Sequence, residues 1–281
     1  MELILDTAKG DDRVRAVVLN GSRVNPTLST DVFQDYDVVY FVEDLASFLA
    51  DPGWVDVFGE RMIMQLPDTM DDPPPASYDS FAYLMQFMDG NRIDLTLVPV
   101  DRLDERDADS LSLMLLDKDS LLGSLPPASE QDYLPAPPSE KAYADCCNEF
   151  WWVCPYVAKG LWRHQVLYAK ATFEIIREQL MKMLTWYAGV ETEFGVNFGS
   201  FGKRLDAYLE PEMQRMLMAT YAGADVKETW DALFTMCELF RTTASAVGDH
   251  FGYAYPADDD RRVTNHLQHV RMLPRDAKRM Y

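Results

Sequence analysis

The chain of 281 residues lacks long apolar runs and a secretory leader, and these absences exclude several classes of protein. No stretch approaches the roughly 18 consecutive apolar residues that read as a membrane-spanning helix. The opening residues, MELILDTAKGDDRV, have no basic segment followed by a hydrophobic one, as a secretory signal would have. We therefore expect a cytoplasmic protein that does not associate with membranes.

Cysteine and histidine are also scarce. The cysteines are Cys146, Cys147, Cys154 and Cys237. They form no paired C-x-x-C units of the kind that hold zinc, and they are too few for a disulfide scaffold. We expect buried, free thiols. His266 and His269 share a helix face, but no carboxylate or cysteine pattern completes a metal site around them, so both are expected to be structural.

Positive charge is in short supply, above all in the first half of the chain. The sequence contains 26 Lys and Arg against 46 Asp and Glu, a net charge of −20. Residues 1–140 contain 9 basic and 28 acidic residues, whereas residues 141–281 contain 17 and 18. A strongly acidic half repels nucleic-acid backbones and anionic membranes, and it attracts cations. The charge therefore argues against a nucleic-acid partner and weakly favours a small cationic one.

The first half of the sequence mixes strand and helix patterns. Short β-rich runs predict strands at 15–20, 37–42, 61–66, 81–88 and 93–98. Asp89-Gly90-Asn91 separates the last two runs and favours a tight hairpin turn. Residues 2–9 and 44–50 are expected to be helical.

Repeated prolines between Gly123 and Ser139 predict an extended connection, and beyond it the periodicity becomes helical. One apolar stripe recurs at alternating spacings of three and four: Val166, Ala169, Phe173, Ile176, Leu180, Met183 and Tyr187. Further helices are expected near 141–160, 200–221, 225–248 and 260–280. We predict an α+β chain, with a mixed sheet and flanking helices over residues 1–138 and an all-α bundle over 139–281.

Three acidic residues at strand positions are the best candidates for chemistry. Asp35 and Asp37 begin a predicted strand two residues apart, so their side chains share one face. Asp94 interrupts an otherwise apolar strand, where a carboxylate is costly without a partner. Neighbouring carboxylates repel unless a cation neutralises them, and oxygen-only ligation suits Mg²⁺. Upstream, Gly21 lets the backbone approach a phosphate, and Ser22 can donate to its oxygens.

A Gly-Ser pair, an Asp-x-Asp pair and a third acidic residue on a later strand resemble the fingerprint of the nucleotidyltransferase superfamily. Their order, strand context and spacing all match it. The competing interpretation is a surface turn followed by exposed acids in an Asp-rich chain. That interpretation is disfavoured because the Asp pair adjoins the strongly apolar run 38–42.

Two longer blocks resemble the aminoglycoside 6-adenylyltransferases, the streptomycin-modifying enzymes. The first comprises residues 21–25, 33–42 and 94–97, and the second is DCCNEFWWVCPYVAKGLWR at 145–163. The resemblance covers both halves of the chain. It implies transfer of AMP from ATP to the 6-hydroxyl of streptomycin, release of pyrophosphate, and antibiotic resistance.

The same resemblance assigns roles to the residues of the first half. Asp35 and Asp37 would hold Mg²⁺, with Asp94 joining them as a ligand or acting as the base. Gly21, Ser22 and Arg23 are expected at the nucleotide. In the second half, Lys159 and Lys203 are candidates for contacting the triphosphate, because a net-negative protein still needs cations near ATP. Gly199–Lys203 is similar to a P-loop only superficially, because Asn197 and Arg204 stand where Gly and Ser or Thr are needed.

Acidic and aromatic residues of the helix 141–160 are the candidates for the cationic substrate. Asp145, Glu149, Trp152 and Tyr156 recur at spacings of three or four and so share one face. Carboxylates and aromatic rings both attract guanidinium groups, of which streptomycin carries two. Glu174 on the next helix is a further candidate. The alternative is an ordinary helix that buries its tryptophans and solvates its acids.

Other functions remain open from the sequence. The same chemistry could act on another aminoglycoside, a nucleotide or a protein hydroxyl, and the helical half could be an interaction module. Intact Asp35, Asp37 and Asp94 argue against a nucleotide-binding module without catalysis. A monomer is expected. Pro155 is expected to kink or break its helix, or to be tolerated as a bend.

Overall fold

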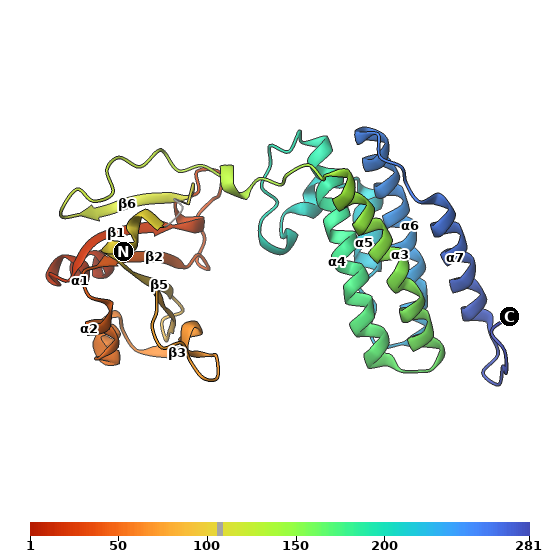
Figure 1. Cartoon of the computed structure of the whole chain (residues 1–281), viewed down its shortest axis with the longest axis horizontal. Helices are drawn as coiled ribbons and strands as arrows, with labels where there is room; N and C mark the ends of the chain where they lie inside the picture. Colours follow the sequence, from red (N-terminus) through yellow and green to blue (C-terminus); the bar gives the residue numbers. More distant parts are fainter. Residues whose placement is uncertain (106–108) are drawn as a thin grey trace. The chain divides into compact units, whose positions relative to one another are not determined.

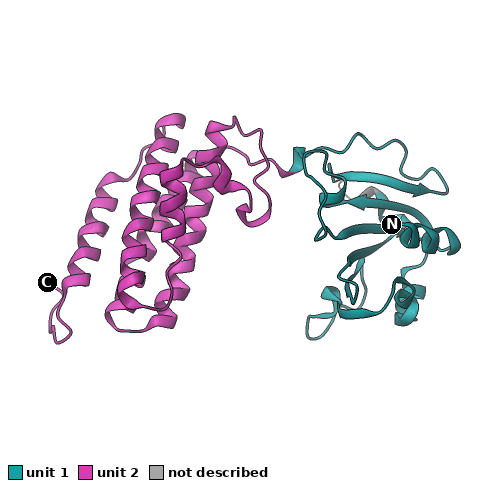
Figure 2. Ribbon diagram, turned by 180° about the vertical axis from the view of Figure 1, so that it is seen from behind, with its two compact units in different colours: residues 1–132 teal, residues 133–281 magenta. Residues whose placement is uncertain are grey.

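The computed structural model describes residues 1–105 and 109–281, which form two compact units, residues 1–132 and 133–281 (Figures 1 and 2). The first unit is built on a mixed sheet, and the second is helical. The predicted α+β class is confirmed. The division between the units falls inside the proline-rich segment 123–139, where the only regular element within the described part of the chain is the short 3₁₀ turn η5 (Gln131–Tyr133).

The sheet has six strands in the order β3-β4-β5-β2-β1-β6. They are β1 (Val14–Asn20), β2 (Tyr36–Val42), β3 (Arg61–Gln65), β4 (Phe81–Phe87), β5 (Arg92–Pro99) and β6 (Ser112–Asp117). β2 and β5 pair in parallel, whereas the other neighbours are antiparallel. The five predicted strands are confirmed to within one or two residues at each end, as is the hairpin between β4 and β5. The edge strand β6 was not predicted.

Helices cover one face of this sheet. They are α1 (Glu2–Gly10) and α2 (Leu45–Leu49), both confirming predictions, and they share a core with the even-numbered residues of β2. The Tyr40 hydroxyl donates a hydrogen bond to the Ile4 carbonyl at 2.5 Å and so ties α1 to the sheet. This face of the sheet is therefore covered by packed helices.

The opposite face of the sheet carries a much smaller hydrophobic cluster. Val39 and Phe41 lie there in a cluster with Ala16, Val18 and Val98, packed by residues of the following loops. Because side chains alternate along a strand, the odd-numbered residues of β2 and the even-numbered residues of β5 point to this side. The beginning of this face, where β2 and β5 start, is left for polar residues.

Short 3₁₀ turns complete the unit: η1 (Gly21–Arg23), η2 (Pro52–Phe58), η3 (Pro67–Thr69) and η4 (Val100–Glu105).

The helical unit consists of five helices, with two 3₁₀ turns between the second and the third. The helices are α3 (Glu140–Trp162), α4 (Val166–Glu191), α5 (Pro211–Ala219), α6 (Val226–Phe251) and α7 (Ala257–Met272). The Ser139 side chain caps α3 by accepting from the Ala142 amide at 3.1 Å, and Asp225 caps α6 in the same way. Five residues of the apolar stripe predicted on α4 are buried in the core and Tyr187 packs against it, whereas Val166 at the start of the helix is not part of the core. All four cysteines are buried and free, as expected.

Two helix predictions in this unit are wrong in extent. No single helix spans 200–221: the turns η6 (Ser200–Gly202) and η7 (Leu205–Tyr208) come first, and α5 begins only at Pro211. Gly199, Phe201 and Gly202 all have positive φ, which a right-handed helix does not accommodate. α7 stops at Met272 and not near residue 280, because Pro274 disfavours a helical Leu273.

Pro155 neither breaks nor ends its helix, since α3 continues from Glu140 to Trp162. Within the ranges 1–105 and 109–281, no helix combines the length and the apolar character that crossing a membrane requires.

Candidate active site

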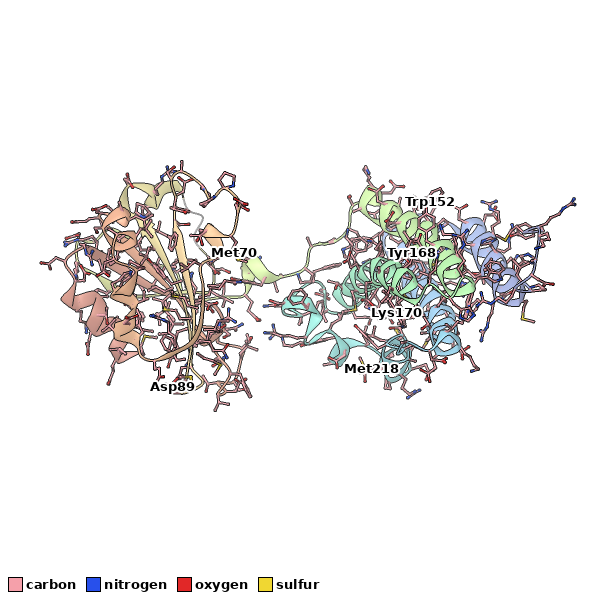
Figure 3. The ribbon with its side chains drawn as sticks, turned by 90° about the horizontal axis from the view of Figure 1, so that it is seen from below. Met70, Asp89, Trp152, Tyr168, Lys170 and Met218 are labelled. Atoms are coloured by element: carbon pink, nitrogen blue, oxygen red, sulfur yellow. The ribbon has the colours of Figure 1, made fainter. Side chains whose placement is uncertain are left out.

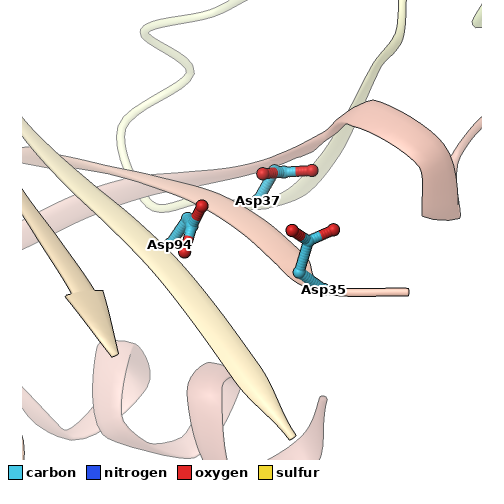
Figure 4. Close-up of side chains that lie close together, drawn as sticks. All are labelled: Asp35, Asp37 and Asp94. Atoms are coloured by element: carbon cyan, nitrogen blue, oxygen red, sulfur yellow. The ribbon is translucent and has the colours of Figure 1, made fainter. Parts of the chain in front are cut away.

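The three acidic residues singled out in the sequence meet at one point of the sheet (Figure 4). Asp37 and Asp94 are direct register partners on the parallel strands β2 and β5. Asp35 immediately precedes β2, on the same side as Asp37. One carboxylate oxygen from each residue lies within 4.8 Å of the other two. All three oxygens can therefore contact a single cation.

Electrostatics at this cluster favour a bound cation. Burial raises the pKa of Asp37 to about 6, and the charges of Asp35, Asp94 and Asp109 add to this rise, whereas Arg92 opposes it. A raised pKa means that the site destabilises its own negative charge. Carboxylate oxygens are the donors that Mg²⁺ prefers, so the donor set fits that ion.

Gly21 makes room for Asp37. Its φ is +74°, and a Cβ atom placed on it would lie 2.2 Å from Asp37 Oδ2. Its amide donates to the Leu111 carbonyl at 3.0 Å, which fixes the turn after β1. The glycine is therefore required both by the left-handed backbone and by the carboxylate that lies against it.

Arg23 fixes the segment that carries Asp35. Its Nε donates to the Asp35 carbonyl at 2.9 Å and its Nη2 to the Gln34 carbonyl at 2.7 Å. The guanidinium also stacks on the Tyr36 ring, 3.7 Å from its centroid. Gln34 Nε2 donates in turn to the Ser22 carbonyl at 3.2 Å. The Gly-Ser-Arg turn and the Asp-x-Asp segment are thus locked together, and the contacts of Ser22 and Arg23 with a nucleotide stay predictions.

Arg92 belongs to this site and was missed in the sequence. Its Nε and Nη2 donate to the two carboxylate oxygens of Asp94 at 2.7 and 2.6 Å, and its Nε lies 3.7 Å from Asp35 Oδ2. The signal was present, because residues two apart on a strand share a face. An arginine two positions before a candidate ligand therefore points at the same site.

Of the four predicted substrate residues on α3, three are exposed, whereas Tyr156 is partly buried and packs against the core. Asp145 and Glu149 are exposed, and Asp145 pairs with Lys141. Trp152 is 63% exposed on the surface of α3 (Figure 3), with its ring 6.3 Å from that of Tyr156. Trp152 and Tyr156 line a cavity of about 710 Å³ between α3 and α7. Aromatic and acidic groups are therefore side by side on an accessible helix face.

The other predicted contacts of the helical unit lie elsewhere on it. Glu174, on α4, pairs with Arg177 at 3.0 Å, and Arg177 is buried and donates to Thr220 at the end of α5. The carboxylate of Glu174 thus serves a structural ion pair. Its contact with a substrate stays a prediction.

The two predicted phosphate-binding lysines also differ in their surroundings. Lys159 Nζ lies 4.9 Å from the centroid of the Tyr156 ring and lines a cavity of about 400 Å³ with Arg163, Lys278 and Arg279. These cations make that cavity suitable for an anion. The stem of Lys203 instead packs over Gly199, where an added Cβ would be 2.9 Å from Lys203 Cγ.

A mixed sheet that brings a Gly-Ser turn, an Asp-x-Asp pair and a third aspartate to one point defines a nucleotidyltransferase-type enzyme. Residues 1–270 match the family model described as streptomycin adenylyltransferase. The chain belongs to this family, which confirms the resemblance seen in the sequence.

Curated relatives match along almost the whole chain. An aminoglycoside 6-adenylyltransferase from Bacillus subtilis (strain 168) is 38% identical, and the match covers 96% of this chain and 96% of the relative. One from Campylobacter jejuni is also 38% identical, and the match covers 95% of this chain and 92% of the relative. A Staphylococcus aureus protein of the same name is 33% identical, and the match covers 95% of this chain and 96% of the relative. A crystal structure of an aminoglycoside 6-adenyltransferase from Bacillus subtilis is 35% identical over 97% of both chains, with a TM-score of 0.48.

Proposed function

We propose that the protein transfers AMP from ATP to the 6-hydroxyl of streptomycin, releases pyrophosphate, and thereby confers resistance. The observation that carries the chemistry is the convergence of Asp35, Asp37 and Asp94, whose carboxylate oxygens lie within 4.8 Å of one another where the adjacent parallel strands β2 and β5 begin. Family membership and the names of the relatives support the acceptor.

The proposed reaction is an in-line displacement at the α-phosphate. The acceptor oxygen forms a bond to the α-phosphorus, the bond to the bridging oxygen breaks, and pyrophosphate leaves. Asp35 and Asp37 would hold Mg²⁺, which when bound neutralises charge on the attacking and leaving oxygens. Asp94 completes the set, either as a third ligand or by accepting the proton of the acceptor hydroxyl.

The remaining residues divide between the two substrates. Gly21 keeps Asp37 in place, Arg23 keeps Asp35 in place, and Ser22 with Lys159 and Lys203 is assigned to the phosphates. A guanidinium-bearing substrate suits the acids and rings of α3, namely Asp145, Glu149, Trp152 and Tyr156, with Glu174 as a further candidate.

The test combines an acceptor panel with bacterial growth. Purified protein with ATP and Mg²⁺ is offered streptomycin, a second aminoglycoside, a nucleotide and a protein hydroxyl, and pyrophosphate release is measured. We expect release with streptomycin, a product heavier by one AMP residue, and higher streptomycin tolerance of sensitive bacteria that express the chain. Release with another acceptor alone would overturn the substrate and retain the chemistry, whereas no release with any acceptor would argue against both.

A further inference from the structure

One positively charged side chain lies inside the acidic cluster. Arg92 binds both carboxylate oxygens of Asp94 in a parallel, bidentate arrangement at 2.6 and 2.7 Å, and it extends to within 3.7 Å of Asp35 Oδ2. Bidentate pairs of arginine with a carboxylate are among the strongest charge-assisted hydrogen bonds. The guanidinium thus uses both oxygens of Asp94 and sits against a second member of the triad.

A divalent ion needs the same oxygens. Carboxylate ligands bind Mg²⁺ at roughly 2.1 Å, so an Asp94 oxygen that accepts a hydrogen bond from Arg92 is a poorer ligand. A guanidinium a few ångströms from the metal position also repels a divalent cation, in a site that is only partly open to water. The arrangement with Arg92 bound and the arrangement with a metal held by all three carboxylates therefore compete.

Arg92 is free to leave without disturbing the core. Its backbone is the first residue of β5 and pairs with Gln86, so the strand stays anchored, while its side chain is 48% exposed. Rotation about its side-chain bonds moves the charged group into solvent or onto a neighbouring anion.

We propose that Arg92 is a built-in counter-cation of the catalytic carboxylates, which takes the place of the divalent ion at Asp94 and Asp35 until the nucleotide arrives. This inference rests on the proposed function of the triad as the metal site. It follows that the free enzyme binds divalent ions weakly. The triphosphate then supplies both the metal ion and a set of negative oxygens to which the released guanidinium can bind, so that metal and nucleotide bind together.

The test measures binding of Mn²⁺ alone to the full-length protein, without nucleotide, by the electron paramagnetic resonance signal of free Mn²⁺. Arg92→Gln removes the charge and keeps a polar side chain that can donate hydrogen bonds. We expect it to tighten Mn²⁺ binding at least about tenfold, because it removes one repulsive charge and frees both oxygens of Asp94. An affinity equal to that of the wild type would overturn the proposal.

Arg15→Gln is the matched control. Arg15 also belongs to the sheet unit and also pairs with two acids, Asp119 at 2.5 Å and Glu43 at 3.5 Å, but it lies at the opposite end of β1 from the cluster. It should change the Mn²⁺ affinity by less than about twofold, since the length of β1 separates it from the cluster and salt screens charges over such separations. Equal tightening in both variants would show a general effect of net charge and would overturn the proposal.

A further variant separates this proposal from the function on which it rests. Adding Asp37→Asn to Arg92→Gln should abolish the gained affinity if the ion occupies the triad. If neither the wild type nor Arg92→Gln binds Mn²⁺ with or without ATP, the triad is not a metal site, and the proposed function fails as well. If Mn²⁺ binds only with ATP in both proteins and equally tightly, the function stands and the role of Arg92 is refuted.

Discussion

Gly21 has no side chain, and this leaves room for the carboxylate of Asp37 in the candidate active site. An added Cβ would lie 2.2 Å from Asp37 Oδ2, and the backbone has φ +74°. Gly21→Ala should therefore displace the Asp37 carboxylate and lower kcat by at least about a hundredfold, because metal ligands tolerate little displacement. The free energy of unfolding should fall by only about 1–2 kcal/mol, the usual cost of a left-handed non-glycine residue.

Gly90→Ala controls for the backbone cost. Gly90 also has a positive φ, +88°, but nothing lies within 4 Å of an added Cβ. It should lose a similar amount of stability in denaturant titrations and keep full transferase activity. If Gly21→Ala is as active as Gly90→Ala, the packing of Asp37 against the turn does not matter for catalysis.

Asp37 itself carries the sharpest prediction for a single side chain. Asp37→Asn should abolish AMP transfer and leave the far-UV spectrum and thermal midpoint near those of the wild type, because it removes one metal-binding charge without adding bulk. Asp6→Asn, on the exposed surface of α1, removes the same charge away from the site and should have no effect on turnover. Pyrophosphate release is the measurement, and near-normal release from Asp37→Asn would defeat the metal assignment.

Among the elements, strands were predictable where apolar residues run together. Asp35 and Asp37 were predicted to share a face because side chains alternate along a strand. The position of Asp94 beside them depends on the parallel register of β2 and β5, which alternation within one strand does not give. β6 was missed because it is an edge strand with little buried surface, so its sequence lacks a clear alternation. Arg92 was missed although its position two residues before Asp94 places both side chains on one face. The sequence does not show that the two side chains form an ion pair.

Helical predictions failed where backbone conformation overrode periodicity. The residues around 199–202 read as part of a helix, but two glycines and Phe201 adopt positive φ, and Pro211 sets the start of α5. Arg177 likewise appears as one more polar residue of α4, whereas tertiary contacts bury it against Thr220 at the end of α5. Such pairings depend on how helices meet, which no local pattern contains.

The buried carboxylate of Asp260, on α7, connects this helix to α6. Asp260 is 5% exposed and accepts hydrogen bonds from Arg241 at 2.5 and 2.7 Å, from the Tyr255 hydroxyl at 2.9 Å and from the Thr264 hydroxyl at 3.0 Å. Asp260→Asn should lower the free energy of unfolding by roughly 3 kcal/mol, because it leaves Arg241 without its charge partner. Asp259→Asn, which breaks only an exposed pair with Arg262, should cost about 0.5 kcal/mol or less. Urea titration measures both.

The same residue predicts a dependence on pH. Burial raises the pKa of Asp260, but hydrogen bonds from Arg241, Tyr255 and Thr264 outweigh it, so the pKa is lowered from its ordinary value. A depressed pKa in the folded protein stabilises it above the unfolded value of about 3.9, and this contribution is lost as the pH falls through the folded pKa. The difference in stability between wild type and Asp260→Asn should therefore be constant near neutrality and shrink below about pH 4. An undiminished difference in acid would contradict the assignment.

For the whole molecule, the division into two units suggests a division of labour between two substrates. The sheet unit carries the acidic triad, and the helical unit carries the accessible acids and rings of α3. Glu149 is the informative residue, because Asp145 is already paired with Lys141, whereas Glu149 has no cation within ion-pairing distance in the described ranges of the chain.

Glu149→Gln should raise the KM for streptomycin by about tenfold or more, since a carboxylate that binds a guanidinium contributes roughly 1.5–3 kcal/mol. The KM for ATP should change by less than twofold, because the nucleotide is assigned to other residues. Glu178→Gln, on the exposed surface of α4, removes the same charge and should leave both constants unchanged. Steady-state kinetics with each substrate varied in turn decide the matter. Parallel rises in both KM values would mean that Glu149 supports the fold, and an unchanged KM for streptomycin would remove this face of α3 from the acceptor site.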